Sequence, residues 1–203
     1  MSRTPTRSVH WNTVYETRAA DAVSWFEASP DRSLGWIARV GAAPAEPVID
    51  VGGGLSGLGG ALLDLGFEDV TLLDISDTAV RRQVAARPAL HGIVADVSTW
   101  RPERVYGVWH DRAVLHFLQS EPERTGYRRA LEAGLRAGGH AIIATFAPDG
   151  PETCSGLPVR RYDAAGLAAF LGDDFEPLWD ERFDHRTPWG AIQRFEVAIF
   201  RRR

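Results

Sequence analysis

The chain has 203 residues, of which 44% are hydrophobic and 25% charged, and its formal net charge is -4. This length predicts one domain with a sizeable core, and the charge balance gives no sign of a nucleic-acid partner. A single cysteine, Cys154, excludes an internal disulfide. Since no apolar run reaches the roughly 20 residues of a membrane span, and residues 1–8 lack the apolar part of a secretory signal, we expect a cytoplasmic protein with no membrane partner.

The N-terminal part of the chain predicts two helices. Residues 1–9 are polar, and we expect them to be loose. From Trp11 to Glu27 the apolar residues recur at helical spacing, which predicts a helix over that range. Ser29-Pro30-Asp31 then predicts the start of a second helix, which ends at Gly41.

A regular alternation of strands and helices follows. Short apolar runs predict strands, and small-residue or amphipathic stretches with capping residues predict helices between them. This alternation is typical of an α/β fold with a parallel sheet. The expected strands are 47–51, 69–74, 91–96, 105–110 and 140–146, and the expected helices are 55–65, one opened by Ser76, and one from the capping box Ser120–Glu123 to Gly138.

The alternation stops after residue 146. A loop rich in Pro and Gly covers 147–162, and a short helix is expected at 164–171. Strands at 175–183 and 195–200 predict an antiparallel hairpin on the edge of the sheet. No repeat or second domain is visible, so we expect 1–203 to form one domain.

The glycine stretch after the first strand is the strongest motif. Gly52-x-Gly54-x-x-Gly57 follows Val48-Ile49-Asp50-Val51, a strand, and precedes a helix, so the backbone can approach a nucleotide-like ligand closely. Taken alone, the pattern fits a dinucleotide site as well as any other nucleotide cofactor.

Three aspartates narrow the choice. Asp50 precedes the glycines by two residues, where a carboxylate would repel a pyrophosphate but suits a ligand with an ammonium and a sulfonium group. Asp74 ends the second strand, where it can accept from both ribose hydroxyls. Asp96 ends the third strand and can accept from an adenine amino group, while the backbone N–H of Val97 donates to the ring. Each acid alone could be a helix cap, but three at neighbouring strand ends favour an adenosyl ligand.

Together, Asp50-x-Gly52-x-Gly54, Asp74, Asp96 and the closing hairpin resemble the class I S-adenosylmethionine-dependent methyltransferases over residues 47–200. One departure is that Ser56 stands at the usual third glycine. The opening His10-Trp11-x-x-x-Tyr15 and Val23-Ser24-Trp25-Phe26 resemble a subgroup that includes the citrate synthase lysine methyltransferase and bacterial members of unassigned substrate.

The resemblance implies a Rossmann-like seven-stranded sheet of order 3-2-1-4-5-7-6, with strand 7 antiparallel and helices on both faces. It implies a helical lid over 1–46, a cofactor-binding half over 47–146 and a substrate side over 147–203. The methyl acceptor would be a small molecule or a protein lysine, and S-adenosylmethionine the cofactor. The cofactor-binding residues it implies are Trp11, Tyr15, Asp50, Gly52, Gly53, Gly54, Asp74, Ile75, Asp96, Val97 and His110.

Ionisable residues cluster after the fourth strand, where this fold carries the transferred methyl group. His110, Asp111 and His116 are the candidate catalytic residues, and His110 or Asp111 could instead bind the methionine part of the cofactor. Asp111 could equally cap the next helix with Arg112 as its ion-pair partner, and His116 could be a packed histidine. We expect no metal site.

The sequence leaves open the roles of two further segments and two alternative functions. The 147–162 loop favours a binding role because it is long, although Cys154 reads as a packed thiol. The turn from Asp184 to Gly190 could cover a substrate or simply face solvent. The alternative functions are an NAD(P)-dependent oxidoreductase, against which Asp50 counts, and a non-catalytic cofactor-binding protein.

Overall fold

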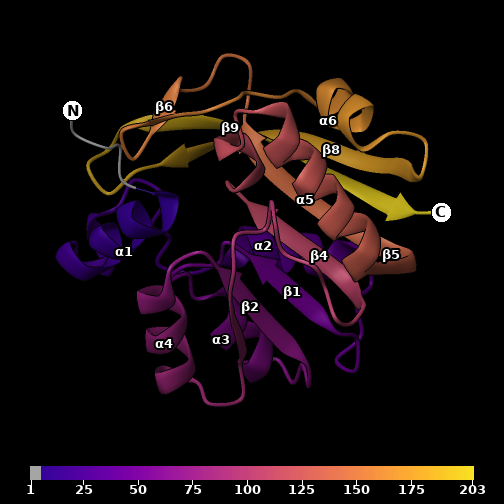
Figure 1. Ribbon diagram of the computed structural model, residues 1–203, viewed down its shortest axis with the longest axis horizontal. Coiled ribbons are helices and arrows are strands. Elements are labelled where there is room, and N and C mark those ends of the chain that lie inside the picture. Colours follow the sequence, from indigo (N-terminus) through magenta and orange to yellow (C-terminus); the bar gives the residue numbers. More distant parts are fainter. Residues whose placement is uncertain (1–5) are drawn as a thin grey trace.

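The computed structural model describes residues 6–203 and has a seven-stranded sheet at its centre (Figure 1). The strand order is β3-β2-β1-β4-β5-β9-β8. Strands β1 to β5 are parallel, and β9 is antiparallel to both β5 and β8. The strands are β1 (Val48–Val51), β2 (Val70–Asp74), β3 (His91–Val94), β4 (Tyr106–Arg112), β5 (Leu135–Phe146), β8 (Phe175–Arg186) and β9 (Ile192–Arg202).

This topology confirms the predicted order. Two very short strands, β6 (Thr153–Cys154) and β7 (Leu157–Pro158), form a separate hairpin within the 147–162 loop. With this hairpin set aside, β8 and β9 are the sixth and seventh strands of the sheet. The α/β, Rossmann-like fold expected from the sequence is therefore present.

Helices cover both faces of the sheet because its central strands are apolar on both sides. Val48, Val70 and Val108 pack with α2 and α3 on one face. Ile49 and Trp109, one residue further along their strands, pack with α5 and α6 on the other. The helices are α1 (Arg7–Thr17), α2 (Asp31–Arg39), α3 (Leu58–Asp64), α4 (Asp77–Ala86), α5 (Glu121–Gly134) and α6 (Ala164–Leu171).

Helix starts follow the predicted capping chemistry. The Ser76 hydroxyl accepts from the backbone N–H of Ala79 at the start of α4. At the start of α5, Ser120 and Glu123 form both hydrogen bonds of a capping box. These caps fix where the chain turns from a strand end into a helix, and therefore where the strand-end loops lie.

The N-terminal predictions need correction. The stretch 1–9 is described only from residue 6, and residues 7–9 already belong to α1. The helix expected over 11–27 ends at Thr17, since Arg18 is extended, with φ -110° and ψ 140°. The apolar residues after Arg18 continue the helical spacing in the sequence, but in the structure they line a cavity and not a helix face. In a smaller shift, β5 begins at Leu135 instead of His140.

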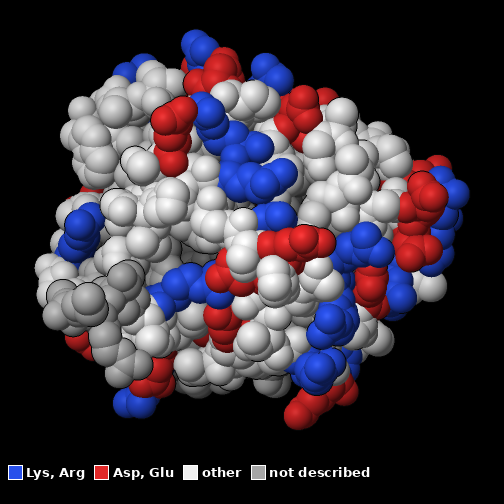
Figure 2. All heavy atoms as spheres, turned by 45° about the horizontal axis from the view of Figure 1, so that its top comes forward, with Lys and Arg blue, Asp and Glu red and all other residues white. Residues whose placement is uncertain are grey.

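Two surface properties complete the fold. On the face drawn in Figure 2, basic and acidic side chains lie close together, in agreement with surface ion pairs such as Arg194–Asp149 and Arg161–Glu152. Within residues 6–203, no helix combines the length and the apolar character that a bilayer crossing requires.

Candidate functional site

The glycine turn lies at the carboxyl end of β1, between β2 and β4 in the middle of the sheet. Gly52 and Gly54 have φ values of +68° and +52°, in the left-handed region that favours glycine. A Cβ atom at Gly52 would collide with Val114, and one at Gly54 with the Tyr15 hydroxyl. Backbone and side chains therefore approach each other closely here, which only glycine permits.

The displaced third glycine does not disturb the turn. Ser56, at the usual glycine position, donates from its hydroxyl to Asp50 Oδ2 over 3.3 Å. Gln83 of α4 donates to the carbonyls of Gly54, at 3.3 Å, and Ser56, at 2.6 Å. A helix from the neighbouring βα unit thus fixes the turn, and nothing in the sequence near the glycines indicates this contact.

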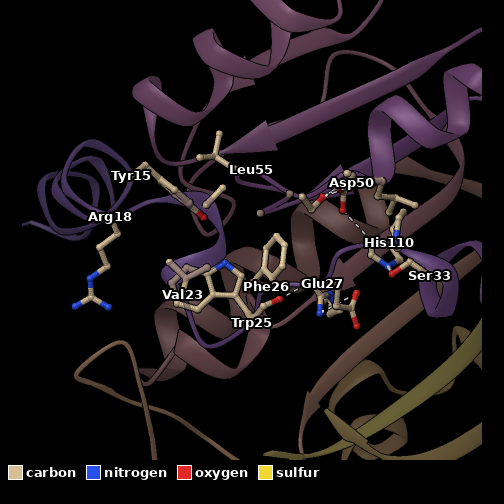
Figure 3. A pocket seen from close by; sticks show the side chains of 18 of the residues that line it. Tyr15, Arg18, Val23, Trp25, Phe26, Glu27, Ser33, Asp50, Leu55 and His110 are labelled. Atoms are coloured by element: carbon tan, nitrogen blue, oxygen red, sulfur yellow. Dashed lines mark hydrogen bonds and ion pairs between the residues drawn. The ribbon is translucent and has the colours of Figure 1, made fainter. Parts of the chain in front are cut away.

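Two cavities meet at the turn. The first, the Asp50 cavity, lies between the turn, Ser33, His110 and the segment 18–27 (Figure 3). The second, the Asp74 cavity, runs along the carboxyl ends of the parallel strands to the start of the antiparallel strand β9. The residues lining both are Tyr15, Trp25, Gly52 and Arg112.

A buried hydrogen-bonded chain forms the floor of the Asp50 cavity. Asp50 and His110 are direct neighbours on β1 and β4, and His110 Nδ1 lies 2.8 Å from Asp50 Oδ1. The other ring nitrogen, Nε2, lies 2.9 Å from the Ser33 hydroxyl. All three side chains are buried. With Nδ1 donating to the carboxylate, Nε2 accepts from the hydroxyl, so the ring has no nitrogen left for proton transfer to a substrate.

The Asp50 cavity contains charges of both signs. Arg112 Nη1 lies 3.2 Å from Glu27 Oε2, and Arg112 Nη2 donates to the Trp25 carbonyl. The alternative in which Arg112 pairs with Asp111 is therefore not what the structure has. Arg18 also lines the cavity, but in Figure 3 its guanidinium points away from Asp50 and His110. Asp50 and Arg112 together can bind a ligand group that carries both an ammonium and a carboxylate.

Asp74 lies buried at the end of β2. Its Oδ2 accepts from the N–H of Gly54 at 2.9 Å, and its Oδ1 accepts from the N–H of Ser76 at 2.7 Å. Burial raises the pKa of Asp74 from 3.8 to about 6, although the two N–H donors act in the opposite direction. The group is therefore mostly ionised at pH 7. Each of its oxygens has a second lone pair, so the carboxylate can still accept from a pair of hydroxyl groups.

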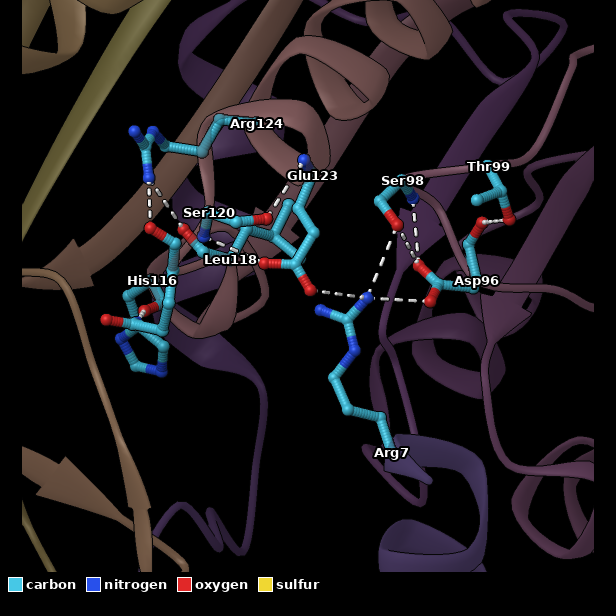
Figure 4. A network of polar contacts seen from close by, with 10 residues as sticks. Arg7, Asp96, Ser98, Thr99, His116, Leu118, Ser120, Glu123 and Arg124 are labelled. Carbon is cyan, nitrogen blue, oxygen red and sulfur yellow. Dashed lines mark hydrogen bonds and ion pairs between the residues drawn. The ribbon is translucent and has the colours of Figure 1, made fainter. Parts of the chain in front are cut away.

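Asp96 is part of an ionic network with α1 (Figure 4). Arg7 Nη2 lies 2.7 Å from Asp96 Oδ2 and 3.2 Å from Glu123 Oε1. The backbone N–H and the hydroxyl of Ser98 both donate to Asp96 Oδ1. The first residue of α1 therefore ties this helix to the end of β3 and to the start of α5, across the Asp74 cavity. Sequence reasoning missed Arg7, because 89 residues separate it from Asp96.

Most of the other predicted cofactor residues line the Asp74 cavity. Trp11 and Tyr15 of α1 form part of its wall, with Ile75 and Val97 next to the two aspartates. Gly53 lines the Asp50 cavity. Trp11 packs edge-to-face against Trp25 and Phe117, with ring centroids 5.6 and 5.1 Å apart. The helix α1 thus covers the cavity, as the expected lid would.

Two predicted catalytic residues have structural positions instead. The carboxylate of Asp111 is fully buried and accepts from the N–H groups of Val114 and Leu115 and from the Tyr127 hydroxyl. It caps the short 3-10 helix Leu115–Phe117, which is the alternative that the sequence left open. Asp111 lines neither cavity, and its role in catalysis or at the cofactor stays a prediction.

His116 is also buried and lines neither cavity. Burial lowers its pKa to about 3, so the ring is neutral at pH 7. Its Nδ1 accepts from the backbone N–H of Phe146, and the ring packs against Phe117. These contacts agree with the alternative of a packed histidine, and the role of His116 as a general base stays a prediction. The catalytic role of His110, whose two ring nitrogens contact Asp50 and Ser33, is likewise untested.

The C-terminal part contributes residues that the sequence did not single out. Gln193 and Phe195 at the start of β9 line the Asp74 cavity, as do Phe146 and Cys154. Phe146 and Phe195 lie in strands that the sequence predicts, whereas the sequence places Gln193 before the last strand and Cys154 in a loop. An open hairpin gives no signal for which side chains face the cavity. In the turn after β8, Trp189 is 62% exposed and lines neither of the two cavities.

Comparisons with known proteins agree with the fold. No protein-family model and no curated protein matches the chain by sequence. Among solved structures, a SAM-dependent methyltransferase from Anabaena variabilis is 15% identical, with a TM-score of 0.75 over 97% of this chain and 93% of that one. A 1,6-didemethyltoxoflavin N1-methyltransferase from Burkholderia thailandensis, with S-adenosylhomocysteine bound, is 22% identical, with a TM-score of 0.70 over 93% and 80%.

A third structure, magnesium protoporphyrin IX methyltransferase from Synechocystis with bound SAM, is 19% identical, with a TM-score of 0.65 over 85% of this chain and 77% of that one. The narrower resemblance to the citrate synthase lysine methyltransferase is not confirmed by these neighbours and stays a prediction. At these identities the similarity is one of architecture, and the chain has the Rossmann-like fold that these SAM-dependent methyltransferases share.

Proposed function

We propose that the protein is a methyltransferase that uses S-adenosylmethionine and transfers its methyl group to a nitrogen or oxygen nucleophile. The observation that carries this proposal is the arrangement of carboxylates around the glycine turn. Asp50 lies in one cavity, Asp74 and Asp96 lie in the other, and the two cavities join at Gly52. This separation matches a ligand with an amino-acid end and an adenosine end.

The described residues fit such a cofactor. Asp50, held by His110 and Ser56, would bind the ammonium group, and Arg112 would bind the carboxylate. Asp74 would accept from the ribose hydroxyls, and Ile75 and Val97 would pack near the adenine. Asp96 would bind the adenine amino group, provided that Oδ2 is shared with or released by Arg7. The glycines let the side chains of Val114 and Tyr15 pack directly against the turn, close to where the two ends of the ligand would meet.

When bound, the cofactor supplies an electrophilic methyl group on a sulfonium. The chain contributes binding and alignment, which can lower a barrier by about 7–11 kcal/mol in the best cases. Tyr15 and Trp25 line both cavities, and Trp11 lines the Asp74 cavity beside them. Asp111 and His116 line neither cavity, so we propose that the protein uses neither as a base and that the acceptor loses its proton to solvent through the open cavity.

We propose for His110 and Ser33 a positioning role. Their hydrogen bonds keep one oxygen of Asp50 oriented on the cavity floor, although the carboxylate is buried. His110 would therefore act on cofactor binding and not on proton transfer. The His110→Gln variant should weaken cofactor binding and leave the pH dependence of the methyl-transfer rate constant unchanged.

The oxidoreductase alternative is not supported. A dinucleotide would place a pyrophosphate at the glycine turn, next to the buried carboxylate of Asp50. The neighbours reported above methylate 1,6-didemethyltoxoflavin and magnesium protoporphyrin IX, by their descriptions. They favour a small-molecule acceptor over a protein lysine.

A thermal-shift comparison tests the proposal. The melting temperature is measured with S-adenosylmethionine, S-adenosylhomocysteine, NAD and NADP at equal concentrations. We expect the two sulfur ligands to raise it and the two nicotinamide ligands to leave it unchanged. If neither sulfur ligand raises the melting temperature, the proposed function is wrong.

A further inference from the structure

We propose that the methyl acceptor is a small, uncharged, planar aromatic compound that carries a hydrogen-bond donor, and that Gln193 recognises this donor. This inference rests on the proposed function and names the substrate class for the same site. Its basis is the part of the Asp74 cavity that lies beyond the cofactor residues, under β4, β5 and β9. The residues lining this part, which we call the acceptor chamber, are Trp25, Phe117, Phe146, Cys154, Gln193 and Phe195.

The chamber has aromatic walls on two sides. On one side, Trp25 and Phe117 both pack edge-to-face on Trp11, at interplanar angles of 75° and 74°. On the other side, Phe146 and Phe195 pack with centroids 4.7 Å apart at 75°. These interlocked rings give two fixed apolar walls that offer both faces and edges. Flat aromatic ligands gain from such walls both by burying apolar area and by ring–ring contacts.

The chamber contains no carboxylate among its lining residues. Asp74 and Asp96 lie on the cofactor side of the cavity, at the ends of β2 and near β3. Arg112 lines the same cavity, but its guanidinium pairs with Glu27 at 3.2 Å and offers no unpaired positive charge. Cys154 adds no charge, because burial raises its pKa to about 11. An ammonium group, such as that of a lysine side chain, would therefore lose its hydration here without gaining a carboxylate partner.

Gln193 is the polar side chain that can orient a ligand in the chamber. Its side chain is on β9, only 8% exposed, and it lines the cavity. Its Oε1 has no hydrogen-bond partner among residues 6–203 and exposes almost no surface, even towards the cavity. Leaving a buried acceptor unpaired costs about 1–3 kcal/mol, so a rotation of the amide that turns this oxygen to a ligand N–H or O–H in the cavity is favourable. The same bond would orient the ring relative to the junction of the two cavities.

The test measures binding to the protein saturated with S-adenosylhomocysteine, by ligand-observed NMR titration. The probes are neutral heteroaromatic compounds of one to three rings with an N–H or O–H donor, and the same compounds with that donor methylated. Further probes are aromatic carboxylates of matched size and two amines, n-butylamine and Nα-acetyl-lysine methylamide. Each is titrated into the wild type, into Gln193→Leu and into Gln119→Leu. The last is a matched control, since Gln119 is exposed and lines neither cavity.

We expect donor-bearing neutral aromatics to bind best, and methylation of the donor to weaken binding about tenfold, as the loss of one hydrogen bond predicts. In Gln193→Leu the two forms should bind equally, while Gln119→Leu should behave as the wild type does. The wild-type comparison of methylated and unmethylated probes does not depend on whether Gln193→Leu folds.

Three results would overturn the inference: amines or carboxylates that bind as tightly as the neutral aromatics, no effect of methylating the donor, or no binding of any aromatic probe. Failure of the proposed function is distinguishable from all three. In that case S-adenosylhomocysteine itself would not bind, as the thermal shift reports before any probe is added.

Discussion

Replacing Asp74 with asparagine isolates the charge of the carboxylate at the end of β2. The change preserves the shape of a side chain that accepts from two backbone N–H groups and is placed to accept from two ribose hydroxyls. Hydrogen bonds to charged groups contribute about 1.5–3 kcal/mol, against about 0.5–1.5 for neutral ones. Two hydroxyl bonds that lose charge assistance therefore cost about 2–3 kcal/mol, or about a 30- to 150-fold loss of affinity.

The same substitution removes an unfavourable contribution to the stability of the ligand-free protein, although it weakens ligand binding. Because the pKa of Asp74 is raised from 3.8 to about 6, its ionised form costs the fold about 3 kcal/mol at pH 7, and this cost is relieved as the pH falls from 6 towards 4. Asparagine removes that cost but places an NH₂ group opposite the N–H of Gly54 or Ser76. Affinity, and not melting temperature, is therefore the appropriate readout.

The assay is calorimetric titration of S-adenosylhomocysteine into the wild type, Asp74→Asn and Asp64→Asn at pH 7.5. Asp64 provides the matched control, because it is exposed, pairs with Arg87 and lines neither cavity. We expect the dissociation constant to rise about 30- to 150-fold for Asp74→Asn and to stay unchanged for Asp64→Asn. A change below about threefold in a folded Asp74→Asn protein would refute the assignment of Asp74 to the ribose.

Three further outcomes follow from the same geometry. Wild-type affinity for S-adenosylhomocysteine should be constant above pH 7 and fall about tenfold per pH unit below 6, as Asp74 with its pKa of about 6 becomes protonated; a profile that Asp74→Asn leaves unchanged would contradict this. Arg7→Ala should raise the rate of amide hydrogen exchange in α1 about fivefold. Arg81→Ala, which removes an exposed ion pair on α4, should leave this rate unchanged. Equal exchange rates in the two variants would mean that the Arg7 contacts do not hold α1. Cys154, with its pKa raised to about 11, should react with iodoacetamide at least about 100-fold more slowly at pH 7.5 than in the urea-unfolded chain, measured by intact mass; comparable rates would show that the thiol is not buried.

The sheet could be predicted from the sequence because each of its elements carries a local signal. The capping residues Ser76 and Ser120, the apolar strand runs and the glycine turn are all short-range features. The N-terminal helix was predicted to be too long for a related reason. Apolar spacing reports burial, but residues 18–22 are exposed, and Val23, Trp25 and Phe26 contact a cavity instead of a helix neighbour.

Besides Trp11 and Tyr15, which the family resemblance supplied, the cavity residues were predicted where they stand in or next to strand ends. Strand position alone predicts that Asp50, Asp74 and Asp96 lie near one another, because parallel strands end at the same edge of the sheet. Asp111 also ends a strand, but its carboxylate turns to cap Leu115–Phe117, and sequence spacing does not distinguish the two orientations. Arg7 and Gln193 depend on contacts across the whole fold, so no local pattern indicates them.

The order of the strands along the chain has a consequence for how the acceptor specificity of this protein can change. The cavity residues assigned to the cofactor lie between residues 7 and 112, whereas most of the acceptor chamber lies between Phe117 and Phe195, on β5, β9 and the β6–β7 hairpin. The two sets meet at the pairing of β4 with β5. Substitutions in the later part of the chain can therefore alter most of the proposed acceptor chamber without touching the residues proposed to hold the methyl donor. Trp25, which lines the chamber from the N-terminal part of the chain, is the exception. Most changes of substrate would thus fall in one contiguous segment of the gene.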